Sequence, residues 1–124
     1  MQNKTFSIAV LGAGNIGSAV LTRLKELDDN VLNLELKRVL VNDTSKDRGV
    51  SKDILTDNFD DILNDDSIDL VIEVLGGVDP GKEYIKSLLQ KGKAVITANK
   101  DIIADCGQEL ITLAEENNTC LYFE

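Results

Sequence analysis

The sequence predicts one α/β domain with a mainly parallel, doubly wound β-sheet and helices on both faces. Short apolar stretches of strand length alternate with longer amphipathic stretches of helix length along the chain. The 124 residues are 43% hydrophobic and contain no Trp, so Ile, Leu and Val dominate the core, as in parallel sheets buried on both faces. A glycine-rich turn joins the first predicted strand to the first predicted helix. We therefore treat residues 1–124 as one domain.

The expected strands are short apolar runs with the length of buried parallel strands. They cover residues 5–11, 34–41, 69–75, 94–98 and 120–123. Between them, helical spacing of apolar residues predicts helices over residues 18–28, 80–91 and 101–117. Pro80 near the start of the second helix and Gly92 just past its end fit the usual asymmetry of helix termini. Residues 53–63 predict a short, poorly formed helix or an irregular segment.

Composition narrows the function classes. The formal net charge of −9 argues against nucleic acid or anionic membranes as partners, because phosphate binding needs clustered Lys and Arg. No apolar run has the length of a bilayer span and the first residues lack a signal-peptide pattern, so we expect a cytoplasmic location. The absence of His excludes His-dependent catalysis, and no metal site is expected. Cys106 and Cys120 have no metal or redox spacing and are expected to be reduced, partly buried thiols.

The glycine-rich turn is the strongest single motif. Gly12, Gly14 and Gly17 form G-x-G-x-x-G between a strand and a helix, with Asn15 and Ile16 inside it. In this context, the first glycine permits a tight turn, the second a close approach of phosphate, and the third close packing of helix on strand. The turn therefore predicts binding of a dinucleotide, NAD or NADP; the alternative is a tight turn with a structural role only.

The end of the second strand bears on the choice between these cofactors. An acidic residue there accepts hydrogen bonds from the adenosine ribose, whereas nearby Arg or Lys favours a 2′-phosphate. The sequence offers both: Asn42 and Asp43 at the strand end, then Lys46 and Arg48. The alternative for Lys46 and Arg48 is a solvated loop, and the preference for NAD or NADP stays open.

Two further turns belong to the same edge of the predicted sheet. The first is Leu75-Gly76-Gly77, which follows Glu73, a carboxylate within an apolar strand. Glycines at a strand end let a ligand pass close to the backbone, so this turn predicts contact with the nicotinamide half of the cofactor. The alternative is an ordinary turn beside a Glu73 side chain that is satisfied by backbone N–H groups.

The second is Thr97-Ala98-Asn99-Lys100, which follows a strand and opens a helix. We expect Thr97, Asn99 and Lys100 to contact the cofactor. An ammonium at this position can stabilise a developing alkoxide, which makes Lys100 the candidate catalytic residue. The alternative is a surface lysine, although a cation near a helix N-terminus is electrostatically unfavourable.

Together these motifs resemble the N-terminal nucleotide-binding region of homoserine dehydrogenase. The resemblance rests on residues 8–17, 71–77, 92–100 and 121–124 and covers essentially the whole chain. It implies a Rossmann-type fold and an NAD(P)-dependent hydride transfer that interconverts L-homoserine and L-aspartate 4-semialdehyde in threonine and methionine biosynthesis. It also implies that Lys100 lies near the substrate and the nicotinamide. Asn42 departs from the family pattern, since members often carry Arg just before the acid of strand two.

The resemblance further implies that family members continue past Tyr-Phe-Glu into a substrate-binding, dimer-forming domain, which carries a second Lys, the substrate carboxylates and a metal-ion site. We therefore expect residues 1–124 to bind the cofactor but not to catalyse efficiently on their own, with the amino-acid substrate and a homodimer belonging to the full-length enzyme. One alternative is a stand-alone nucleotide-binding or sensing module without catalysis. Another is a different dehydrogenase with a similar first domain, such as an aspartate dehydrogenase or dihydrodipicolinate reductase type, against which the T-A-N-K segment argues.

Overall fold

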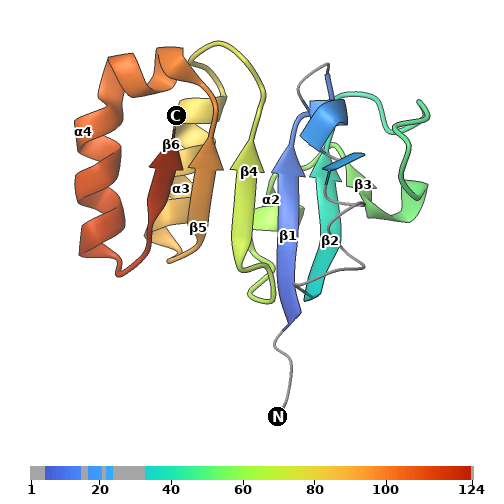
Figure 1. Ribbon diagram of the computed structural model, residues 1–124, viewed down its shortest axis with the longest axis horizontal. Coiled ribbons are helices and arrows are strands. Elements are labelled where there is room, and N and C mark those ends of the chain that lie inside the picture. The colour runs from blue at the N-terminus through green and yellow to red at the C-terminus, as the bar shows by residue number, and fades with distance from the viewer. Residues whose placement is uncertain (1–4, 15–16, 21, 24–32, 124) are drawn as a thin grey trace.

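The computed structural model describes residues 5–14, 17–20, 22–23 and 33–123. Its sheet has the strand order β3-β2-β1-β4-β5-β6, and every strand pair is parallel (Figure 1). The carboxyl ends of the strands consequently meet along one edge, where open α/β sheets bind ligands. The strands are β1 (Thr5–Leu11), β2 (Asn33–Leu40), β3 (Leu55–Thr56), β4 (Leu70–Glu73), β5 (Ala94–Thr97) and β6 (Leu121–Phe123).

Helices lie on both faces of this sheet, as the sequence predicted. On one face, α3 (Gly81–Gln90) and α4 (Lys100–Glu116) bury Ile85, Leu88 and Leu110 in one cluster with strand residues. The ion pairs Lys82–Asp105 and Lys86–Glu109 join these two helices at 3.1 and 2.9 Å. On the other face, residues 17–20 and 22–23 are helical, and Val20 packs against the cluster that contains Val10 and Val39. Residues 24–28 of that predicted helix lie outside the described residues.

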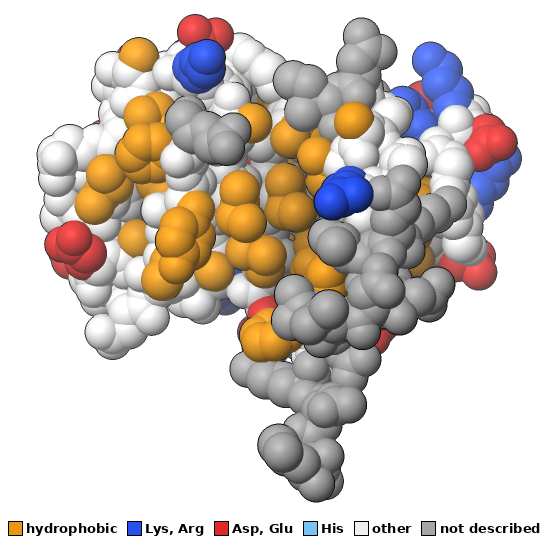
Figure 2. All heavy atoms as spheres, viewed as in Figure 1, with side chains coloured by type: hydrophobic (Ala, Val, Ile, Leu, Met, Phe, Trp, Pro, Cys, Tyr) orange, Lys and Arg blue, Asp and Glu red, His pale blue; other side chains and the backbone are white. Residues whose placement is uncertain are grey.

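On the face that carries Val20, the described residues leave the half of the sheet formed by β4, β5 and β6 uncovered (Figure 2). Ile72, Ile96 and Tyr122 are register partners on β4, β5 and β6, so their side chains share this face. Ile96 is 36% exposed and Tyr122 is 60% exposed. Figure 2 shows hydrophobic side chains gathered over this half of the sheet. An apolar surface of this kind is typical of a contact region rather than of a solvated face.

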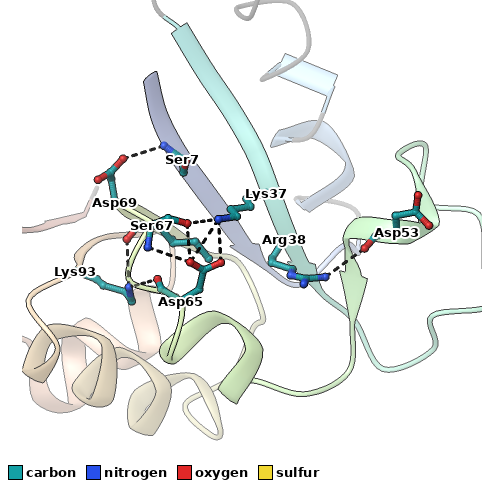
Figure 3. Close-up of polar contacts among 9 residues, drawn as sticks. Ser7, Lys37, Arg38, Asp53, Asp65, Ser67, Asp69 and Lys93 are labelled. Carbon is teal, nitrogen blue, oxygen red and sulfur yellow. Dashed lines mark hydrogen bonds and ion pairs between the residues drawn. The ribbon is translucent and has the colours of Figure 1, made fainter. Parts of the chain in front are cut away.

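A polar cluster joins the sheet to the turn that precedes β4, away from the carboxyl ends of the strands (Figure 3). The Lys93 ammonium donates to the backbone oxygens of Asp65 and Ile68 at 2.6 and 3.2 Å. Burial lowers the pKa of Lys93. The Asp65 carboxylate accepts from the Ser67 backbone N–H at 3.0 Å and pairs with Lys37 at 3.2 Å. These contacts anchor the turn to β2 and to the start of β5.

The prediction for residues 53–63 was only partly right. The segment contains the 3₁₀ turn η1 (Lys52–Ile54), the strand β3 and the short helix α2 (Asp60–Leu63). β3 pairs with the end of β2, and the Val41 N–H donates to the Thr56 oxygen at 2.9 Å. A strand of two residues is too short to show a period in the sequence, so only the pairing with β2 reveals it.

The two cysteines differ in exposure, which corrects the prediction that both are partly buried. Cys106 is buried and Cys120 is exposed, and both are free thiols. Burial raises the pKa of the Cys106 thiol. Within the part of the chain that the structure describes, no helix is long and apolar enough to cross a membrane. The same residues contain no group of three His, Cys, Asp or Glu side chains placed to hold a metal ion.

Candidate cofactor-binding site

The glycine-rich turn begins directly at the carboxyl end of β1. Gly12 has φ +102°, and its N–H donates to the Leu40 oxygen on β2 at 2.9 Å. A Cβ atom at Gly17 would lie only 2.6 Å from the Gly12 oxygen, so the first helical residues approach the strand end more closely than any side chain allows. Gly17 is buried and forms part of the support of the turn. The first and third glycines therefore have the turn and packing roles that the motif predicts.

Gly14 has the opposite environment. It is exposed, and nothing lies within 4 Å of the place where its Cβ would stand. Its carbonyl oxygen accepts from the Ser18 N–H at 2.8 Å, which begins the helix. Open space at a strand end and before a helix N-terminus suits a phosphate group. Asn15 and Ile16, which the sequence also assigned to this site, lie outside the described residues.

A cavity of about 460 Å³ extends from this turn toward the end of β2. Arg48 lines it, and its guanidinium donates to the Ala13 oxygen at 3.5 Å and to the Asp43 oxygen at 3.4 Å. The Arg48 Nε atom is buried without a partner among the described residues. The other lining residues are Gly12, Ala13, Gly14, Leu40, Val41, Asn42, Asp57, Val74, Leu75, Gly76, Asp79, Pro80 and Tyr84.

Asp43 and Lys46 do not line this cavity. The Asp43 carboxylate accepts hydrogen bonds from the Ser45 N–H at 2.9 Å and from the Ser45 hydroxyl at 2.5 Å. These bonds from Ser45 hold the pKa of Asp43 below its ordinary value. The carboxylate is therefore engaged within its own loop, and the lining groups at the end of β2 are Asn42 and Arg48.

A second cavity, of about 540 Å³, lies over the ends of β4 and β5. Gly76 and Gly77 line it with φ values of +83° and +69°, which few residues other than glycine adopt. Gly14, Val74, Leu75 and Gly76 line both cavities, so the two adjoin each other beside the glycine-rich turn. The remaining lining residues are Ala98, Asn99, Lys100 and Asp101.

Asn99 and Lys100 occupy the start of α4 at this second cavity. Asn99 caps the helix, because its Oδ1 atom accepts from the N–H groups of Asp101 and Ile102 at 3.1 and 3.2 Å. Lys100 is exposed, and among the described residues no carboxylate forms an ion pair with its ammonium. Thr97, in contrast, is only 1% exposed and lies beneath the cavity rather than in its wall.

Sequence reasoning did not single out three polar residues that line the first cavity: Asp57, Asp79 and Tyr84. Tyr84 stacks on Phe59 with ring centroids 4.0 Å apart. Its sequence signal is only a position in an amphipathic helix, which does not tell whether a side chain faces the core or a cavity. Asp57 follows β3, the strand that the sequence did not predict.

Comparison with known proteins agrees with this geometry. The family model described as the NAD-binding domain of homoserine dehydrogenase matches residues 12–124. The homoserine dehydrogenase of Bacillus subtilis is 38% identical to the chain over 98% of the chain and 30% of the relative. A crystal structure of the Staphylococcus aureus enzyme at pH 8.5 superposes with a TM-score of 0.91 and 40% identity, over 99% of this chain and 33% of that one.

A more distant structure shares the fold. A hyperthermophilic archaeal homoserine dehydrogenase in complex with NADPH superposes with a TM-score of 0.79 and 22% identity, over 98% of this chain and 44% of that one. The chain thus spans about 30% of the length of the curated relatives that it matches. The family match over most of the chain shows that it belongs to the homoserine dehydrogenase family, as its NAD-binding domain.

Proposed function

We propose that the dinucleotide lies along the two adjoining cavities, with its pyrophosphate in front of Gly14. The adenosine half then faces Asn42 and Arg48, and the nicotinamide half faces Gly76, Gly77 and Lys100. The observation that carries this proposal is the wall shared by the two cavities at Gly14, Val74, Leu75 and Gly76. It provides one path from the end of β2 to the ends of β4 and β5. Gly12 and Gly17 support the turn, and Thr97 supports the far end from below.

In the whole enzyme, we propose that the bound NAD(P)H transfers hydride to the carbonyl carbon of L-aspartate 4-semialdehyde. The carbonyl oxygen then takes up a proton to give L-homoserine, and the reverse reaction oxidises homoserine. Lys100 fits the role of a cation beside this oxygen, where it stabilises the developing negative charge. On its own, the 124-residue chain is expected to bind cofactor without efficient turnover, because turnover also needs a substrate oriented against the nicotinamide.

A cytoplasmic location and a homodimer complete the proposal. The apolar face with Ile96 and Tyr122 offers this domain a contact surface of its own, in addition to the dimer-forming domain that the resemblance implies. Sedimentation of the chain over a range of concentrations tests this association. A molecular mass that stays monomeric at all concentrations would argue against a dimer formed through this domain.

Calorimetric titration of the chain with NAD and with NADP tests the cofactor site. Gly14→Val should abolish binding, because its side chain would occupy the space for the pyrophosphate, whereas no described atom of the protein lies within 4 Å of its Cβ position. Ala104→Val, on the exposed part of α4, is the matched control and should bind like the original chain. If the folded chain binds neither nucleotide, the proposed site is wrong for this domain.

A further inference from the structure

A buried carboxylate lies beneath the second cavity. Glu73, the last residue of β4, has no exposed surface. Its Oε1 atom accepts from the Thr97 hydroxyl at 2.5 Å, and its Oε2 atom accepts from the Leu75 N–H at 2.8 Å. Burial of a carboxyl group in an apolar layer is costly unless hydrogen bonds compensate it. Both oxygens have such a partner, and both partners precede residues of the cavity wall.

The contacts continue from Thr97 into that wall. Glu73 and Thr97 are register partners on β4 and β5, which places their side chains on the same face of the sheet. The Thr97 hydroxyl also accepts from the Asn99 N–H at 3.0 Å. The Asn99 Nδ2 atom then donates to the Gly77 oxygen at 2.5 Å. A chain of hydrogen bonds therefore runs from Glu73 through Thr97 and Asn99 to the Gly76-Gly77 turn.

These hydrogen bonds connect two parts of the cavity wall, the Gly76-Gly77 turn and the start of α4. Glu73 fixes the turn at Leu75, where it begins, and Asn99 fixes it at Gly77. Asn99 also caps α4, and the next residue is Lys100. The turn and the start of α4 are thus joined through the side chain of Asn99.

The packing around the carboxylate keeps it in place. A Cβ atom at Gly81 would lie 3.2 Å from Glu73 Oε2 and 2.9 Å from the Ile102 side chain. The start of α3 and the first turn of α4 therefore close directly over Glu73. The lack of a side chain at Gly81 makes room for the carboxylate.

We propose that Glu73 is a positioning residue: through Thr97 and Asn99, it sets the Gly76-Gly77 turn and Lys100 in register with the nicotinamide half of the cofactor. This inference rests on the proposed function. Glu73 does not line the cavity and touches no ligand in this arrangement. Glu73 acts by setting the geometry of the Gly76-Gly77 turn and of Lys100, which do line the cavity. Asn42 and Arg48, which face the adenosine half, take part in none of these hydrogen bonds.

The test compares NAD with ADP-ribose, which retains the adenosine half and the pyrophosphate but lacks nicotinamide. Thr97→Val removes the hydroxyl with little change in shape and breaks two of the bonds. We expect the affinity for NAD to fall by about tenfold, because a displaced turn and Lys100 no longer fit the nicotinamide half. The affinity for ADP-ribose should change by less than about twofold. Glu73→Gln should give the same pattern as Thr97→Val, with weaker binding of NAD and little change for ADP-ribose.

Two further variants separate positioning from general damage to the fold. Thr97→Ser keeps the hydroxyl and should restore NAD binding. Thr112→Val makes the same substitution at an exposed site on α4 and should leave both affinities unchanged. Circular dichroism and thermal unfolding show whether each variant is folded.

Three results would overturn the inference. Equal losses for NAD and ADP-ribose in Thr97→Val would show damage to the whole site, and unchanged affinities would show that the chain of bonds positions nothing. Failure of Thr97→Ser to restore binding would exclude the hydroxyl as the cause. Absence of binding of either ligand to the original chain would instead contradict the proposed function, and with it the inference.

Discussion

The backbone oxygen of Gly12 lies only 2.6 Å from the position that a Cβ atom at Gly17 would occupy. The carbonyl carbon of Gly12 lies 2.9 Å from the same point. These contacts are with backbone, which cannot move aside as a flexible side chain can. Gly14, three residues earlier, faces open space. The motif therefore contains one glycine that the fold requires and one that we assign to the ligand.

Gly17→Ala should destabilise the chain, because the helix must move away from the end of β1 to admit the methyl group. We expect a loss of about 1–3 kcal/mol in the free energy of unfolding, the usual cost of overpacking. Urea unfolding followed by circular dichroism measures it. Gly14→Ala is the matched control and should show no loss of stability. Equal stability of the original chain and Gly17→Ala would show that the turn relaxes freely.

The strand–helix alternation was predictable because β1, β4 and β5 are largely apolar runs, and because β2 combines apolar and charged residues over a strand-length segment. The prediction extended β4 to residue 75, but the strand ends at Glu73. An apolar run does not show where pairing stops. Just past the end of β4, the Leu75 N–H donates to the Glu73 carboxylate rather than to a neighbouring strand. The boundary was set by a side-chain contact that local sequence does not reveal.

Some features of the candidate site could likewise be predicted from the sequence, and others depend on contacts that the sequence does not reveal. Gly76, Gly77 and Lys100, which line the second cavity, could be proposed from the sequence because strand ends converge at one edge of a parallel sheet. The partnership of Glu73 with Thr97 depends on the register of β4 against β5, which the spacing of 24 residues does not reveal. Asp43 was a candidate by position, but Ser45 engages its carboxylate locally. Such short-range competition is typical of Asp in loops.

Arg48, rather than Lys46, should recognise a 2′-phosphate on the cofactor. Arg48 lines the first cavity with a buried Nε atom that has no described partner, whereas Lys46 is exposed and outside the lining. Arg48→Ala should weaken NADP binding by about tenfold or more, the scale of a lost charged hydrogen bond, and NAD binding by much less. Lys46→Ala should change the ratio of the two affinities little. Calorimetry with both nucleotides measures this ratio, and an equal loss for both in Arg48→Ala would contradict the assignment.

The two thiols should react at very different rates. Cys120 is exposed, whereas Cys106 is buried in α4 and its pKa is raised by burial. In the native protein, Cys106 should react with a disulfide reagent at least about a hundredfold more slowly than Cys120, because reaction requires local opening of the helix. Cys120→Ser isolates the slow thiol, and denaturant should abolish its protection. Rapid reaction of native Cys120→Ser would show that α4 opens easily near Cys106.

Asp65 should make the stability of the chain depend on pH in the acid range. Hydrogen bonds from Ser67 and the nearby Lys37 ammonium hold the pKa of Asp65 below its ordinary value of 3.8. A carboxyl group with a lowered folded-state pKa contributes stability above its unfolded pKa and loses that contribution as the pH falls through the folded-state pKa. Because the pair is partly exposed, we expect about 1 kcal/mol at neutral pH.

Asp65→Asn removes the charge and nearly preserves the shape, so it isolates this contribution. The difference in unfolding free energy between the original chain and Asp65→Asn should be largest near pH 7 and should shrink below about pH 4, as the original carboxyl group becomes protonated. Urea unfolding at several pH values measures the difference. Asp66→Asn, at the exposed neighbouring position, controls for the change in net charge. A difference that is independent of pH would mean that the Asp65 side chain acts through its shape and hydrogen bonds rather than through its charge.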